Sequence, residues 1–146
     1  MRVDGEWLHC VDGGIRPVVR GEVLGGDGQW HELLLLVDTG ADRTVLSAGE
    51  FRQGQFVPVE TDRRISGVGG LVESVAVDTQ LRLKRSDGQQ VLFRGQFAAC
   101  TDPDALDMSI LGRDILDMFA LLIDRRADLI AILGGQHRCT IQQGPS

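Results

Sequence analysis

The chain has 146 residues, a formal net charge of −6 and 42% hydrophobic residues. This length suits one domain and leaves little room for two lobes with separate cores. With 19 Gly, no Tyr and 5% aromatic residues, the apolar content is mainly Leu, Val and Ile, which favours strands and tight turns over long helices. The acidic balance argues against nucleic-acid or anionic-membrane binding as the main function, because both need clustered positive charge.

Cysteines and histidines are sparse and scattered. The three cysteines are Cys10, Cys100 and Cys139. The three histidines are His9, His31 and His137. Neither set has metal-ligand spacing and no Cys-x-x-Cys occurs, so we expect no disulfide framework, no metal site and, since no cofactor motif appears, no cofactor. No signal peptide is visible and the longest aliphatic run, residues 33–37, is too short to span a bilayer, so we expect a cytoplasmic protein.

Glycine-rich turns divide the first half of the chain into strands. Gly25-Gly26-Asp27-Gly28 separates two apolar stretches, 18–24 and 30–37, and predicts a hairpin. Residues 71–85 alternate between apolar and polar, and Ser86-Asp87-Gly88 then predicts a turn into a strand over 91–99. We expect one domain over residues 1–141, in which residues 1–30 form an N-terminal extension of strands, followed by a flexible tail at 142–146.

The last third of the chain combines one helix with one hairpin. Residues 113–121 have apolar side chains at helical spacing, with Asp114 in the first turn, and predict the single helix. Residues 120–124 and 129–133 flank a polar turn at 125–128, which predicts another hairpin.

A carboxylate follows the most apolar strand. Residues 33–37 are apolar on both faces and predict a strand buried on both sides, which runs directly into Asp38-Thr39-Gly40. An aspartate there is costly unless it is paired or hydrogen-bonded, so Asp38 is a candidate for a perturbed pKa and for acid–base chemistry. Gly40 would allow another backbone or a substrate to approach closely. An ordinary aspartate that opens a turn is the alternative.

The surrounding residues resemble a known family. Residues 35–47, Leu-Leu-Val-Asp-Thr-Gly-Ala-Asp-Arg-Thr-Val-Leu-Ser, closely resemble the active-site segment of the retropepsins, the retroviral-type aspartic proteases. Residues 65–70, Ile-Ser-Gly-Val-Gly-Gly, look like the flap tip, and residues 109–116, Ser-Ile-Leu-Gly-Arg-Asp-Ile-Leu, look like the late strand, turn and helix start. The resemblance implies a mostly β, single-lobe, closed β-barrel with one short C-terminal helix, assembled as a two-fold homodimer.

The resemblance also implies a role for each matching residue. Asp38 would be the catalytic aspartate, Thr39 would hydrogen-bond across to the partner's equivalent loop, and Gly40 would contact the substrate backbone. Substrate would also touch residues of the loop and flap, namely Ala41, Asp42, Arg43, Ser66, Gly67, Val68, Gly69 and Gly70. Arg113 would pair with Asp42 as a buried acidic partner. Viral members usually carry an acidic residue in place of Arg43, so substrate preference would differ there.

One aspartate cannot both accept and donate a proton in peptide hydrolysis, and no second Asp-Thr/Ser-Gly occurs in the chain. A second copy of the chain would supply the other carboxylate across a two-fold axis. Two such charges about 4 Å apart at an effective dielectric of 20 repel by roughly 4 kcal/mol. The pair should therefore share one proton and favour mildly acidic conditions.

The sequence thus predicts an aspartic endopeptidase that acts as a homodimer on extended peptides and binds neither nucleic acid nor membrane. A retropepsin-like binding or dimerisation module with little proteolytic activity is the first alternative. A small β-barrel that binds a ligand through the glycine-rich loop at 67–70 is the second. For the segment 66–70, a plain surface turn is the alternative to a flap. A phosphate-binding loop is not indicated, because the segment has neither Gly-Lys-Ser/Thr nor G-x-G-x-x-G.

Overall fold

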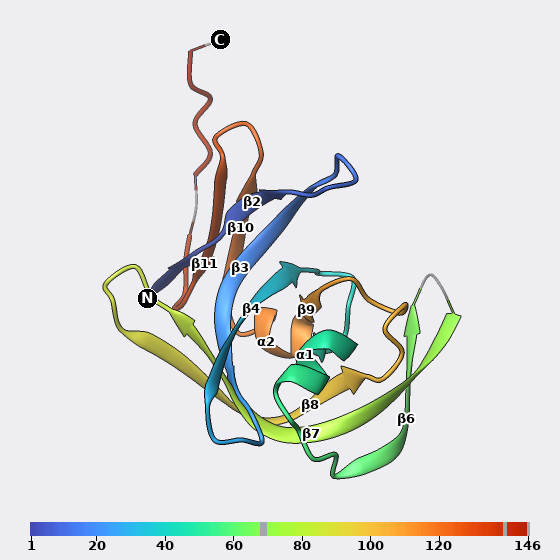
Figure 1. Cartoon of the computed structure of the whole chain (residues 1–146). Helices are drawn as coiled ribbons and strands as arrows, with labels where there is room; N and C mark the ends of the chain where they lie inside the picture. The colour runs from blue at the N-terminus through green and yellow to red at the C-terminus, as the bar shows by residue number, and fades with distance from the viewer. Residues whose placement is uncertain (68–69, 139, 146) are drawn as a thin grey trace.

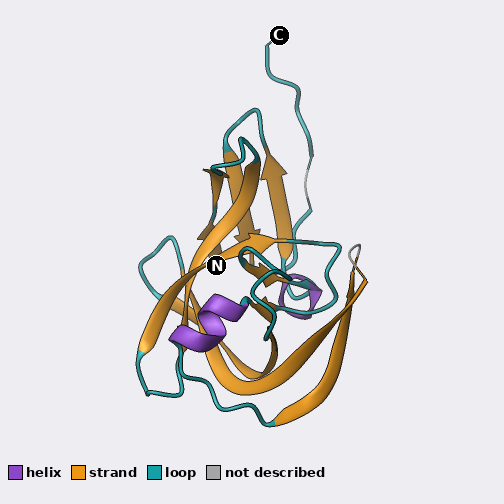
Figure 2. Ribbon diagram, turned by 45° about the vertical axis from the view of Figure 1, so that its right-hand side comes forward, coloured by secondary structure: helices purple, strands orange, loops and turns teal. Residues whose placement is uncertain are grey.

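The computed structural model describes residues 1–67, 70–138 and 140–145, with the backbone alone for 60–67 and 70–72. These residues form strands in two sheets, with two short helices (Figures 1 and 2). The strands are β1 (Arg2–Asp4), β2 (Glu6–His9), β3 (Ile15–Leu24), β4 (Trp30–Val37), β5 (Val45–Leu46), β6 (Glu60–Gly67), β7 (Gly70–Lys84), β8 (Gln90–Cys100), β9 (Ser109–Leu111), β10 (Ala120–Asp124) and β11 (Leu129–Leu133). The helices are α1 (Ala48–Gln53) and α2 (Arg113–Leu116). The mostly β architecture is the one that the composition predicts.

The larger sheet has the strand order β2-β3-β4-β9-β5-β8-β7-β6, and β3 also pairs with β7. The pairs β4–β9 and β5–β8 are parallel and the remaining pairs are antiparallel. Gly21 of β3 lies opposite both Leu33 and Leu83. A Cβ atom at Gly21 would lie 2.9 Å from Cδ2 of Leu83, so the glycine allows the close approach at which β3 joins β7.

The smaller sheet has the order β1-β11-β10 and pairs the first strand of the chain with the last one (Figure 1). Val3 of β1 lies opposite Ile132 of β11, and both side chains are buried. The outer edge of β1 makes one further backbone contact, because the Ser86 N–H donates to the Arg2 carbonyl at 2.8 Å. Within the described part of the chain, no strand pairs with the outer edge of β10.

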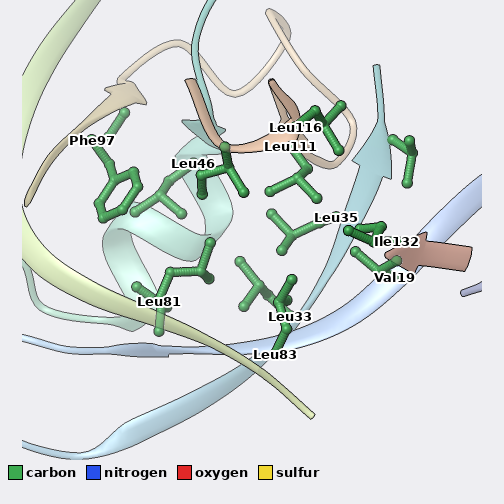
Figure 3. Close-up of a cluster of buried hydrophobic side chains, with 14 of the residues drawn as sticks. Val19, Leu33, Leu35, Leu46, Leu81, Leu83, Phe97, Leu111, Leu116 and Ile132 are labelled. Carbon is green, nitrogen blue, oxygen red and sulfur yellow. The ribbon is translucent and has the colours of Figure 1, made fainter. Parts of the chain in front are cut away.

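Aliphatic side chains from both sheets meet in one core (Figure 3). Leu35 of β4, Leu83 of β7 and Leu111 of β9 are fully buried, and Val19 and Ile132 extend the core towards the smaller sheet. Burying a Leu or Ile side chain stabilises a fold by about 1.5–3 kcal/mol, so this core can hold the strands that flank Asp38.

Three predicted hairpins are confirmed. Gly28 and Gly88 have φ of 77° and 85°, which glycine adopts at little cost, and each turn closes on a backbone hydrogen bond. The third turn joins β10 to β11, where Asp128 has φ of 53°. Glycine-containing turn sequences therefore located the first two turns correctly, and the polar segment 125–128 located the third.

The helix prediction was wrong in length and in number. α2 ends at Leu116, because Ala120 pairs with Leu133 and the chain from there on belongs to the smaller sheet. α1 is an additional helix, and Ser47 caps it by accepting a hydrogen bond from the Glu50 N–H at 3.4 Å. The sequence Ser-x-x-Glu at 47–50 is the capping-box pattern that could have predicted α1.

The strand before Asp38 is also less enclosed than predicted. Leu33, Leu35 and Val37 are buried, whereas Leu34 and Leu36 on the opposite face are only half-buried. One face of β4 therefore packs in the core, and the other retains some exposure within a single chain.

Candidate active site

Asp38 stands directly after β4, beside the end of β9. The parallel pairing of the two strands runs from Leu35↔Ser109 to Val37↔Leu111. The Asp38 N–H then donates to the Leu111 carbonyl at 3.1 Å, which holds the backbone of the aspartate in line with the sheet. Its half-buried carboxylate accepts a hydrogen bond from the Gly40 N–H at 2.9 Å. The pairing of β4 with β9 thus fixes the backbone position from which the Asp38 side chain extends.

The loop that follows Asp38 lies against the turn that opens α2. The Arg113 N–H donates to the Ala41 carbonyl at 2.9 Å, and the Asp114 N–H donates to the Asp42 carbonyl at 3.2 Å. Gly112 packs directly on the backbone of Arg43. Two segments about 70 residues apart in the sequence therefore form one unit, which we call the loop–turn unit (residues 38–44 and 111–115).

A charged pair spans the loop–turn unit. Arg113 donates to the carboxylate of Asp42. The sequence suggested a buried acidic partner, but the side chains are 47% and 82% exposed in the single chain. An exposed pair contributes at most about 1 kcal/mol to stability, so it holds the loop only weakly.

Thr44 and Asp114 form a second contact, which sequence reasoning missed. Oδ1 of Asp114 accepts hydrogen bonds from the Thr44 N–H at 2.9 Å, the Thr44 hydroxyl at 2.7 Å and the Ile115 N–H at 3.0 Å. The Thr44 oxygen in turn accepts from the Gly112 N–H at 3.1 Å. The sequence suggested only that Asp114 belongs to the first turn of a helix, and no local pattern links it to Thr44.

The glycine-rich segment predicted as a flap lies where β6 ends and β7 begins. β6 and β7 pair antiparallel up to Ser66↔Leu71 and Gly67↔Gly70, whereas Val68 and Gly69 lie outside the described residues. β7 pairs with β8, and β8 pairs with β5 through Val45↔Ala98. The hairpin is thus connected through the sheet to the strand that follows the loop–turn unit.

Thr39 and Gly40 are exposed at the surface, as are Asp42 and Arg43, whereas Ala41 is half-buried. Near Gly40, only its own bonded Asp38 oxygen would contact an added Cβ atom, so a second backbone could approach it closely. No group of three or more His, Cys, Asp or Glu side chains in the described ranges could hold a metal ion. Among the same residues, none of the helices has the length and apolar character to cross a bilayer.

The arrangement can supply one positioned carboxylate per chain. Such a group can accept or donate one proton, but hydrolysis of an amide needs both transfers at once. A strand that ends in Asp-Thr-Gly and is clamped by a Gly-Arg-Asp turn, in a mostly β single lobe, defines a retropepsin-like aspartic protease fold. Comparison with known proteins agrees.

The family model described as retroviral aspartyl protease matches residues 15–124, and the chain belongs to this family. One similar solved structure is the EIAV protease complexed with the inhibitor HBY-793, with 28% identity and a TM-score of 0.50 over 70% of this chain and 86% of that chain. Another is a retropepsin-like aspartic protease from Rickettsia conorii, with 18% identity and a TM-score of 0.55 over 90% of each chain. No curated protein matches the sequence well enough to count as a relative.

Proposed function

We propose that the protein is an aspartic endopeptidase that acts as a homodimer, with Asp38 of each subunit forming a catalytic pair. The main support is the position of Asp38 at the end of β4, where the Leu111 carbonyl and the loop–turn unit hold it. Membership of the retroviral aspartyl protease family is consistent with this chemistry. Neither a metal nor a cofactor takes part in the proposed reaction.

The two carboxylates would divide the proton transfers between them. One ionised Asp38 takes a proton from a water molecule as the water oxygen attacks the carbonyl carbon of the peptide bond. The protonated Asp38 of the other subunit donates its proton to the carbonyl oxygen. When the tetrahedral intermediate collapses, the carbon–nitrogen bond breaks and the first Asp38 passes the proton it took from water to the leaving nitrogen. The second Asp38 takes a proton back from a hydroxyl of the intermediate, so the pair again holds one proton.

Neighbouring residues would orient the pair and the substrate. Thr39 is exposed and would hydrogen-bond with the equivalent loop of the second subunit, and Gly40 offers open space beside Asp38 for a substrate backbone. Asp42 and Arg43 would border the substrate from the loop. The segment from Ser66 to Gly70 would cover it as a flap, which excludes water during the reaction.

The edge of β10 is the surface that fits the second subunit. β1 pairs with β11 and its outer edge accepts a hydrogen bond from the Ser86 N–H, whereas among the described residues no strand pairs with the outer edge of β10. The edge of β10 is therefore the one in the smaller sheet that we assign to another strand. Leu122 and Ile123 within β10 have side chains exposed by 45% and 43%, and that of Met118, two residues before the strand, is exposed by 57%. A two-fold axis at Leu122 would pair β10 with its copy and place each Asp124 opposite Ala120, so that like charges do not face each other.

Substitution of Asp38 tests the proposal. The protein should cleave a mixed peptide library at mildly acidic pH, and Asp38→Asn should abolish cleavage while sedimentation shows an unchanged dimer. Asp87→Asn, in an exposed turn, is the matched control and should cleave normally. Cleavage by Asp38→Asn would refute the catalytic role. A protein without activity at any pH would instead support the binding or dimerisation module.

A statine-type inhibitor gives a second test that does not depend on finding a substrate. Its hydroxyl imitates the tetrahedral intermediate, so it should raise the melting temperature only when both Asp38 carboxylates are present. No shift in the unmodified protein would contradict an assembled catalytic pair.

A further inference from the structure

Asp114 accepts several hydrogen bonds although the proposed reaction assigns it no role. Three donors converge on its Oδ1 atom: the Thr44 N–H, the Thr44 hydroxyl and the Ile115 N–H. Two of these donors belong to a residue 70 positions away in the sequence. The carboxylate therefore connects the loop that carries Asp38 to the helix α2.

Thr44 is the buried half of this connection. It is fully buried, and its hydroxyl both donates to Asp114 and accepts from the Gly112 N–H at 3.1 Å. The single hydroxyl proton is thus directed to the carboxylate, and a lone pair is directed to the turn. Without the Asp114 carboxylate, the buried N–H and hydroxyl of Thr44 would both lose their acceptor, which is unfavourable inside a protein.

The Asp114–Thr44 connection lies at the end of the 38–44 loop, and the hydrogen bond from the Asp38 N–H to the Leu111 carbonyl lies at its start. Between them, backbone bonds from Arg113 and Asp114 hold Ala41 and Asp42. By contrast, the Arg113–Asp42 ion pair is exposed to water and contributes little rigidity. Among the side-chain contacts of the loop–turn unit, the Asp114–Thr44 bond is therefore the one that can fix the loop.

We propose that Asp114 is a positioning residue that, through the Thr44 hydroxyl, fixes the loop bearing Asp38 for alignment with its two-fold copy. This inference rests on the proposed function. Two carboxylates contributed by separate chains must meet in one geometry, and a misplacement of about 1 Å can lower a rate roughly a hundredfold. Asp114 is not among the residues proposed to contact the substrate, so its loss should lower the rate of the bound complex rather than the affinity for substrate.

The experiment compares four variants at a temperature and concentration at which each is folded and dimeric. Asp114→Ala and Thr44→Val remove the connection, whereas Asp114→Asn and Thr44→Ser retain an acceptor oxygen and a hydroxyl. We expect the first two to lower kcat by roughly a hundredfold with little change in KM, and the second two to keep most of kcat. The double variant of Asp114→Ala and Thr44→Val should be no slower than either single variant, because both remove the same bond.

Asp117→Ala is the matched control, since Asp117 is exposed at the other end of the same short helix. Full kcat in Asp114→Ala, or an equal loss in Asp117→Ala, would overturn the positioning role while leaving the proposed function intact. Amide hydrogen exchange distinguishes the two proposals if the unmodified protein does not cleave peptides. In that case the proposed function fails, and unchanged exchange at Thr44 and Gly112 in Asp114→Ala would also overturn the structural connection.

Discussion

A methyl group on Gly112 would overlap the backbone of Arg43, because the two residues are in direct contact where the turn before α2 meets the loop after Asp38. The backbone atoms of Arg43 that it would meet are its nitrogen, carbonyl carbon and oxygen, none of which can rotate away. The closeness of this contact leads to the first prediction.

Gly112→Ala should destabilise the protein by about 1–3 kcal/mol, since the added carbon forces the backbone of the loop–turn unit apart. Urea denaturation of both proteins measures the difference. Gly144→Ala is the control, because nothing lies within 4 Å of the corresponding position. Equal stabilities of the Gly112 and Gly144 variants would contradict this, because they would show that the loop moves to accommodate the methyl group without a loss of stability.

Leu122→Asp should weaken the dimer by roughly a hundredfold or more without unfolding the subunit, because a two-fold axis at β10 would bring the two new carboxylates together. Sedimentation at several concentrations measures the dissociation constant, and circular dichroism checks the fold. Leu92→Asp alters a comparably exposed leucine, 41% against 45%, on β8 and should leave the dimer unchanged. A dimer that tolerates Leu122→Asp would place the interface elsewhere.

Burial raises the pKa of the Glu50 carboxyl in α1, and nearby His31 opposes this rise only partly. A raised pKa in the folded state means that the protonated form is favoured, so this contribution to stability is full below the unfolded pKa and is lost as pH rises through the folded one. Glu50→Gln should therefore stabilise the protein at pH 7, by less than about 1 kcal/mol given the partial exposure, and have little effect at about pH 4.

Unfolding free energies of the Glu50→Gln protein at the two pH values test this directly. The exposed Glu32 provides the control through Glu32→Gln, which should change stability little at either pH. A variant that is less stable than the parent at pH 7 would contradict the argument, because it would mean that the charged form of Glu50 is favourable.

The pKa of the Asp27 carboxyl is shifted in the opposite direction to that of Glu50. A hydrogen bond from the Gln29 N–H and a second from His31 lower the pKa of its carboxyl below the usual 3.8. Its contribution to stability is present above the unfolded pKa and disappears as pH falls through the folded value. Asp27→Asn should thus destabilise the hairpin at pH 7 but have a diminishing effect as the pH falls below about 4. Equal losses at pH 7 and pH 2.5 in denaturation experiments would refute this linkage.

Local sequence signals were sufficient to predict the elements whose conformation depends on neighbouring residues. Glycines that need positive φ located the turns at 28 and 88, and alternation of apolar residues located β7. The helix prediction over 113–121 was wrong after Leu116, because pairing of Ala120 with Leu133 is a contact between distant strands that periodicity does not contain. α1 was missed although its capping pattern was present at Ser47.

By itself, the sequence determined that an Asp-Thr-Gly follows an apolar strand and that only one such group exists per chain. Only the tertiary structure decided that Thr44 and Asp114 share a hydrogen bond and that β1 pairs with β11 of its own chain, so that none of the described residues adds a strand to the outer edge of β10. The reason is that turns and strands follow from the preferences of neighbouring residues. Pairing between residues about 70 or more positions apart depends instead on how the whole core packs.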